Sequence, residues 1–174
     1  WLQSPGATVV ADRSRWSSLR PYVEAVVGRF ARDERVVAWD LWNEPDSPNF
    51  AYADRDPAHK ARLIGELLEL VWDWAAEVDP AAPLTVGVYL FPKHHAERAS
   101  AVARTAIERS DVISFHDYTD AAGLTATIDA LSVHGRPLLS AVHMLLSEYS
   151  VFSAPDKQRL LDLLVESRKY QNEV

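Results

Sequence analysis

Residues 36–46 read VVAWDLWNEPD, an apolar run that ends in an Asn, a Glu and a Pro. The run is short and rich in β-forming residues, which is typical of a strand that is buried on both faces. We therefore predict a strand over Arg35–Trp42 and a loop that begins at Asn43. The carboxylate of Glu44 then stands at the carboxyl end of a strand, where its chemistry depends on what the neighbouring strand ends bring beside it.

The rest of the chain alternates between helical and strand periodicity. Apolar residues at helical spacing, with capping signals at Asp56, Asp120 and Gly135, predict helices over residues 18–31, 57–78, 93–108, 121–134 and 158–170. Short apolar segments predict three further strands over residues 84–90, 111–116 and 136–142. No Gly-rich phosphate loop follows any of these strands, which argues against a nucleotide-binding sheet.

Alternating strands and helices of this kind form a parallel sheet with helical cover. A complete (βα)8 barrel usually needs about 250 residues, whereas this chain has 174. We therefore predict an α/β fold that is a partial TIM (βα)8 barrel, roughly a half barrel of four parallel strands with covering helices. Residues 1–174 are expected to form this single truncated barrel domain.

Composition excludes several classes of partner. The formal net charge of −7 argues against nucleic acid or an anionic membrane surface as the main partner. The chain has no cysteine, so it forms neither disulfides nor a thiolate zinc site. No apolar run reaches the roughly 18–20 residues of a membrane span. We predict no cofactor and no metal, and the sequence assigns no cellular compartment.

Barrels of parallel strands place their functional residues just past the carboxyl ends of the strands. This rule selects Asn43 and Glu44 after the first predicted strand, His116 and Tyr118 after the third, and His143 after the fourth. Each residue alone is equally typical of a turn or a solvated loop. Taken together, they can converge on one pocket.

The segment VVAWDLWNEPD resembles the fourth strand of clan A glycoside hydrolases, especially the family 5 cellulase and mannanase group. DVISFHDY, at residues 111–118, resembles the sixth strand of the same barrel. GRPLL, at residues 135–139, also matches a phrase common in bacterial members. The resemblance runs from about Tyr22 to Leu139, and it implies a barrel fold and a carbohydrate substrate.

The resemblance also implies a role for each strand-end residue. Glu44 would be the general acid/base, and Asn43 would contact the sugar 2-hydroxyl. His116 and Tyr118 would line the sugar subsite and help to orient the carboxylates. The predicted site is therefore catalytic Glu44, His116 and Tyr118 with substrate-binding Asn43, Trp42 and His143.

The second carboxylate of this chemistry is not matched. A retaining glycosidase holds two carboxylates about 5–5.5 Å apart, one as acid/base and one as nucleophile. In the family the nucleophile is a Glu after the GRPLL segment, and Val142 stands in its place here. Of the two alternative carboxylates, Glu148 would need a loop to fold back, and strand alternation turns Asp117 away from His116. Residues 140–174 are expected to form a divergent C-terminal segment, since the resemblance ends at Leu139. Three explanations stay open: sequence divergence, a natural truncation, or a gene fragment read into foreign sequence.

Three functions stay open at this point. The first is a hydrolase-like domain derived from a retaining β-glycosidase, with a surviving Glu44 and weak or no glycosidase activity. The second is a carboxylic ester hydrolase that uses the region of Glu44, His116, Tyr118 and His143, because an aryl ester needs less catalytic help than a glycoside. The third is a non-catalytic carbohydrate-binding or structural remnant. The partner is accordingly a carbohydrate or a small ester substrate.

Half a barrel exposes two sheet edges and an apolar inner face. Exposed edges template pairing with another chain, and large apolar patches are rare on soluble monomers. We therefore predict a homo-oligomer, in which two chains complete a closed sheet. Alternatively, the leucine-rich tail that follows Leu139 covers the exposed apolar surface in place of a second chain.

Overall fold

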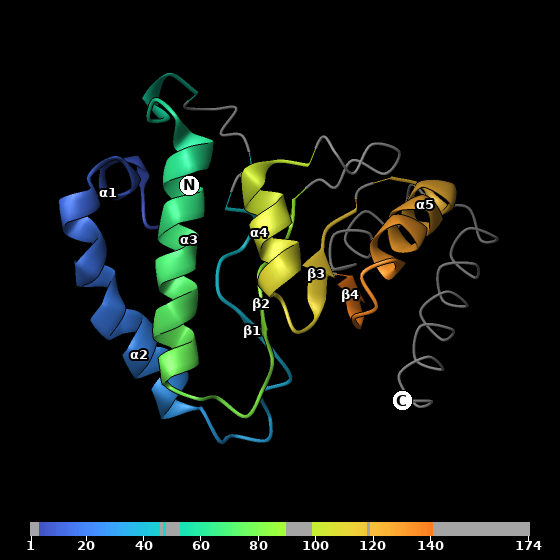
Figure 1. The fold of residues 1–174 in the computed structure, drawn as a ribbon, viewed down its shortest axis with the longest axis horizontal. Coiled ribbons are helices and arrows are strands. Elements are labelled where there is room, and N and C mark those ends of the chain that lie inside the picture. The colour runs from blue at the N-terminus through green and yellow to red at the C-terminus, as the bar shows by residue number, and fades with distance from the viewer. Residues whose placement is uncertain (1–3, 46, 48–52, 90–98, 118, 141–174) are drawn as a thin grey trace, which may run out of the picture.

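The computed structural model describes residues 4–45, 47, 53–89, 99–117 and 119–140 (Figure 1). Short strands alternate with helices along the chain. The helices are α1 (Ala7–Ala11), the 3₁₀-helix η1 (Arg13–Leu19), α2 (Arg20–Arg29), the 3₁₀-helix η2 (Ala53–Arg55), α3 (Lys60–Glu77), α4 (Ala101–Arg109) and α5 (Ala121–Ser132). The strands are β1 (Trp39–Asp40), β2 (Leu84–Thr85), β3 (Ile113–Phe115) and β4 (Leu138–Ser140).

The strands form two short parallel sheets. β1 pairs with β2, with Trp39 opposite Leu84, and β3 pairs with β4 in the same sense. Within the described residues one parallel bridge, between Val88 and Phe115, joins the two sheets. The predicted α/β architecture with parallel strands is therefore confirmed, whereas the half barrel stays a prediction.

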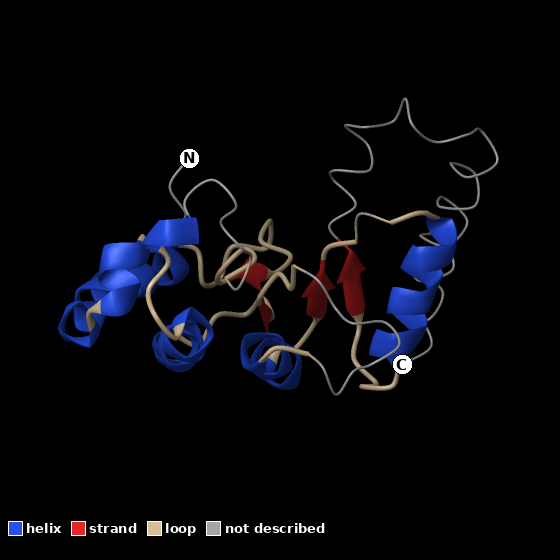
Figure 2. Cartoon of the chain, turned by 90° about the horizontal axis from the view of Figure 1, so that it is seen from above, coloured by secondary structure: helices blue, strands red, loops and turns tan. Residues whose placement is uncertain are grey.

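Within the described residues, each strand covers only part of the apolar segment that predicted it. The ladder of β1 begins where the Trp39 N–H donates to the Pro83 carbonyl at 2.8 Å, so the residues before Trp39 lie outside the sheet. The prediction that this strand is buried on both faces is wrong, since Val37 is 81% exposed and Asp40 is exposed as well. Helices α3 and α4 pack side by side on one side of the strands (Figure 2). The two helices therefore cover one face of the strands.

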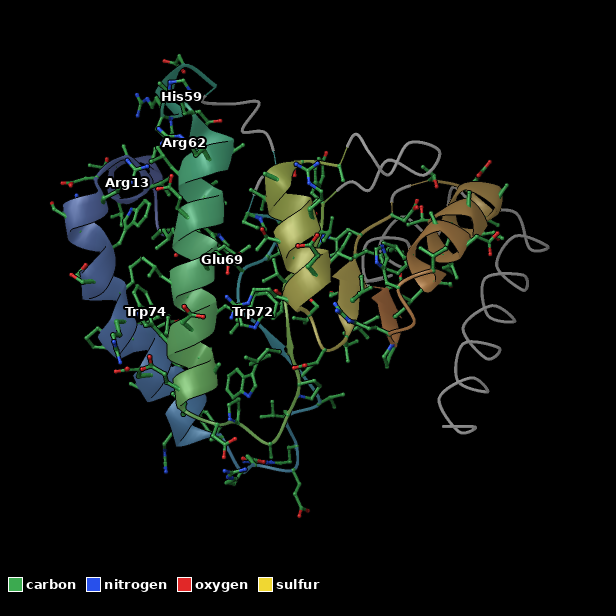
Figure 3. All side chains as sticks on the ribbon, viewed as in Figure 1. Arg13, His59, Arg62, Glu69, Trp72 and Trp74 are labelled. Atoms are coloured by element: carbon green, nitrogen blue, oxygen red, sulfur yellow. The ribbon has the colours of Figure 1, made fainter. Side chains whose placement is uncertain are left out.

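Helix α3 is the central support of the described fold, because α1, α2 and α4 all pack against it. Its predicted apolar stripe is confirmed, and Leu67, Leu68 and Ala75 are fully buried. Trp74 projects toward α2 and Trp72 toward α4 (Figure 3), and both side chains are buried in the core. Burial of each large apolar side chain contributes on the order of 2 kcal/mol.

The predicted start of α3 is wrong by three residues. Asp56 was expected to cap a helix that begins at Pro57, but the helix begins at Lys60 with His59 before it in the left-handed conformation. The Lys60 N–H donates to the Pro57 carbonyl at 3.1 Å, which closes a turn ahead of the helix. Asp56 therefore lies one turn too early to cap, and its carboxylate pairs with the Lys60 ammonium at 3.0 Å instead.

The predicted boundaries of α5 are close to the observed ones. The Asp120 carboxylate accepts from the Gly123 N–H at 2.9 Å, as an N-cap should. Gly135 follows the helix with φ of 63°, a conformation that glycine adopts without strain. α2 lies within the helix predicted over residues 18–31, whereas α4 begins at Ala101, because Ser100 caps it inside the helix predicted over residues 93–108. The helix expected over residues 158–170 falls outside the described residues. No helix in the described part of the chain has the length and apolarity to cross a lipid bilayer.

Candidate active site

Glu44 lies where the chain leaves the first sheet. The N–H groups of Leu41 and Glu44 donate to the carbonyls of Thr85 and Gly87, each at 2.9 Å, so this segment continues alongside the β2 segment after β1 ends. Glu44 itself has φ of 47°, in the left-handed region that a glutamate rarely adopts. Backbone strain of this kind costs about 1–3 kcal/mol and is concentrated at functional sites. The local fold thus holds Glu44 in one orientation at some cost in stability.

His116 reaches the same place from the second sheet. It follows β3, and its N–H donates to the Val88 carbonyl at 2.9 Å. Its Nδ1 lies 2.5 Å from Glu44 Oε1, and the two side chains are only 11% and 15% exposed. An ionised carboxylate only accepts hydrogen bonds, so Nδ1 donates whenever Glu44 is ionised. The structure therefore brings together two predicted site residues that are 72 positions apart in sequence.

Asp40 is a third ionisable group at this place, and sequence reasoning missed it. Its Oδ1 accepts from the Gly87 N–H at 3.0 Å and from the Trp42 N–H at 3.3 Å. Although the residue is exposed as a whole, its carboxylate is turned toward the protein, and burial raises the pKa of Asp40 above its ordinary value. The two backbone hydrogen bonds and the neighbouring His116 oppose that rise without cancelling it.

The side chains of Asp40 and His116 both border the space that Gly87 leaves open. A Cβ at this position would lie 3.0 Å from Asp40 Oδ2 and 3.2 Å from His116 Nε2. The two side-chain atoms are therefore no farther apart than the sum of these distances. One signal in the sequence pointed to this arrangement: an isolated glycine inside an apolar strand pattern, LTVGVYL at residues 84–90, marks a close approach of other groups.

The predicted substrate-binding residues are placed differently from one another. Asn43 is exposed beside Glu44. Trp42 is partly buried against the core, and its indole N–H donates to the Ser4 carbonyl at 3.1 Å. The ring therefore contributes to the packing of the fold. Tyr118 and His143 lie outside the described residues. The same is true of Val142, at the expected nucleophile position, and of Glu148, the alternative carboxylate.

Asp117, considered above as a substitute carboxylate, has a structural position. It is 7% exposed, and it accepts from the Thr119 N–H at 2.8 Å and from the Thr127 hydroxyl at 2.5 Å. These contacts tie the end of β3 to helix α5. No three His, Asp or Glu side chains in the described ranges are grouped so as to hold a metal ion.

Comparison with known proteins adds the following. No family model matches the chain, and no curated protein matches it. Among solved structures, native xylanase 10B from Thermotoga maritima is similar, with 19% sequence identity and a TM-score of 0.48, over 79% of this chain and 46% of that one. Xylanase XynB from Paenibacillus barcinonensis, in complex with a conduramine derivative, is similar over the same shares, with 19% identity and a TM-score of 0.49. The matched region thus spans less than half the length of either xylanase.

Proposed function

We propose that Glu44 is the general acid/base of a glycoside hydrolase-type site and that His116 orients it. One observation carries the proposal: the 2.5 Å contact between Glu44 Oε1 and His116 Nδ1 joins two residues that the sequence selected separately. The left-handed backbone of Glu44 adds support, because strain of this kind persists where a function requires it.

In this role Glu44 works in two protonation states. As a carboxylic acid it gives its proton to the leaving glycosidic oxygen, and as a carboxylate it removes a proton from the attacking water. The His116 contact fixes the orientation of the carboxylate through Oε1. In this proposal Asn43 contacts a sugar hydroxyl, and Trp42, Tyr118 and His143 complete the carbohydrate site.

The proposed glycosidase activity is weak. Retaining hydrolysis requires a second carboxylate as the nucleophile, and the sequence has Val142 at the position where the family resemblance expects it. Asp117 does not supply the missing group in this proposal, since Thr119 and Thr127 hold its carboxylate.

Ester hydrolysis is the second candidate function, and the same contact favours it. A carboxylate that an imidazole orients serves as a general base, which activates water without a second carboxylate. Activated aryl esters need far less catalytic help than glycosides. The pair of Glu44 and His116 is therefore the proposed base for this reaction as well.

A substrate panel tests both functions. The protein is assayed with several nitrophenyl β-glycosides and with nitrophenyl acetate and butyrate, alongside Glu44→Gln and His116→Asn. We expect Glu44→Gln to lower turnover by about 100-fold or more, because it removes the proton that a general acid/base transfers. The matched control is Glu34→Gln, which changes an exposed glutamate ahead of β1 and should leave turnover unchanged.

Each outcome of the panel has one meaning. Glycoside turnover that depends on Glu44 supports the first function, and ester turnover alone that depends on both residues supports the second. No turnover, with sugar binding detected by calorimetry, supports a non-catalytic carbohydrate-binding role. Full activity of Glu44→Gln on every substrate shows that the site has been assigned to the wrong residue.

A further inference from the structure

We infer that Asp40 is a positioning residue, which holds the imidazole of His116 against Glu44 across the space that Gly87 leaves open. The placement of His116 by Asp40 rests on the geometry of these residues, whereas its effect on turnover rests on the proposed function of Glu44.

Asp40 is itself held firmly enough to position another group. Two backbone N–H groups, those of Gly87 and Trp42, converge on its Oδ1. Gly87 belongs to the segment next to β2, and Trp42 follows β1, so the carboxylate is fixed from both strands of the first sheet. Charged acceptors make stronger hydrogen bonds than neutral ones, which favours one rotamer of Asp40.

The second carboxylate oxygen of Asp40 lies on the same side of Gly87 as His116, and the two residues interact electrostatically. Oδ2 and His116 Nε2 both border the position that a Cβ of Gly87 would occupy, at 3.0 and 3.2 Å from it. His116 Nδ1, at the other edge of the ring, contacts Glu44 Oε1. The imidazole therefore contacts the Glu44 carboxylate through Nδ1, and its Nε2 edge borders the Gly87 position that Asp40 Oδ2 also borders. A flipped ring would present carbon atoms at both places.

This arrangement requires a glycine at position 87 because a larger side chain would not fit, and not because of the backbone conformation. Its backbone is outside the left-handed region, so an alanine would be accepted by the backbone conformation. The added methyl group would press on both Asp40 Oδ2 and His116 Nε2, and at least one of them would have to move. Gly87→Ala thus disturbs the placement of Asp40 and His116 without removing any charge.

Asp40→Asn separates positioning from folding. An asparagine keeps a side-chain oxygen that accepts from the Gly87 and Trp42 N–H groups, as Oδ1 does in the native chain. It replaces the negatively charged Oδ2 with an uncharged amide nitrogen opposite His116. The matched control is Asp129→Asn, which makes the same chemical change at an exposed site on α5.

The primary measurement is a long-range ¹⁵N–¹H correlation spectrum of the full chain labelled with ¹⁵N-histidine. The chain has six histidines, and the variant His116→Gln identifies the His116 ring signals by their loss. We expect Asp40→Asn and Gly87→Ala to shift both ring ¹⁵N signals of His116, and Asp129→Asn to leave them in place. Unchanged His116 signals in the first two variants, or an equal shift in Asp129→Asn, would overturn the inference.

Kinetics supply the second measurement. On whichever substrate the native chain turns over, we expect Asp40→Asn to lower kcat by about 10-fold with KM changed by less than about twofold, since orientation of the acid/base acts on the transition state. A lower kcat that returns in Asp40→Glu supports positioning by a carboxylate, and a kcat equal to the native value in Asp40→Asn contradicts it. A native chain without any turnover counts against the proposed function alone, because the ring signals still decide whether Asp40 positions His116.

Discussion

Asp40 keeps a carboxylate where the surrounding protein disfavours its charge. Burial raises its pKa above the ordinary 3.8, and the hydrogen bonds from Gly87 and Trp42 offset that effect in part. Groups with perturbed pKa values are concentrated at functional sites. An uncharged residue would fit this environment at lower cost, and the charge of Asp40 therefore supports a role beside His116.

The raised pKa of Asp40 predicts a pH-dependent effect of Asp40→Asn. Because the folded chain favours protonated Asp40, the stability that this residue contributes is fully present below about pH 3.8 and is lost as pH rises through its folded-state pKa. We expect Asp40→Asn to unfold at a higher urea concentration than the native chain at about pH 7, with the difference gone at about pH 3. An equal difference at both pH values would contradict a titrating Asp40.

Single residues differ in how well the sequence predicts them. Glu44 and His116 were found because both follow the ends of predicted strands, where parallel folds collect polar groups. Asp40 lies inside the apolar run, and its meeting with His116 depends on the register of β1 against β2 and on the bridge from Val88 to Phe115. A single sequence does not encode register in any local pattern, so this arrangement became visible only in three dimensions.

At the scale of elements, α3 provides a matched test of the core. Leu68 is fully buried in the α3 stripe, whereas Leu70, on the same helix, is 37% exposed. We expect Leu68→Ala to lower the free energy of unfolding by about 2–5 kcal/mol, because it leaves a cavity. Leu70→Ala should cost less than about 1 kcal/mol.

Urea unfolding followed by tryptophan fluorescence measures both variants, since Trp72 and Trp74 are buried on the same helix. Similar losses in the two variants would show that α3 does not bury the face assigned to it. The comparison holds helix propensity constant, because both substitutions replace leucine with alanine inside one helix.

Helices were easier to predict than strands for a physical reason. The period of α3 repeats over many residues, and Asp120 and Gly135 mark the limits of α5 with specific backbone geometry. Strand residues, in contrast, are ordered by partners that are distant in sequence. Val37 has a high β propensity, yet it lies before the first ladder hydrogen bond and is exposed.

At the scale of the whole molecule, the predicted homo-oligomer awaits measurement. Within the described residues β1 and β4 each pair on one side only, and Leu139 of β4 is 44% exposed. Sheet edges and apolar side chains of this kind favour association with another chain. We expect size-exclusion chromatography with light scattering to give a mass above that of one chain, and a stable species of 19.5 kDa at micromolar concentration would contradict this.

The bridge between Val88 and Phe115 and the backbone hydrogen bonds that accompany it, such as that from the Val88 N–H to the Ser114 carbonyl, make the candidate site a junction between the two sheets. Glu44 belongs to the side of β1 and β2, His116 follows β3, and their contact spans the seam beside that bridge. Opening of the seam would separate the two side chains while each sheet kept its own ladder. The site would then lose its geometry before the chain unfolds, which makes its integrity a sensitive indicator of how tightly the two sheets are docked.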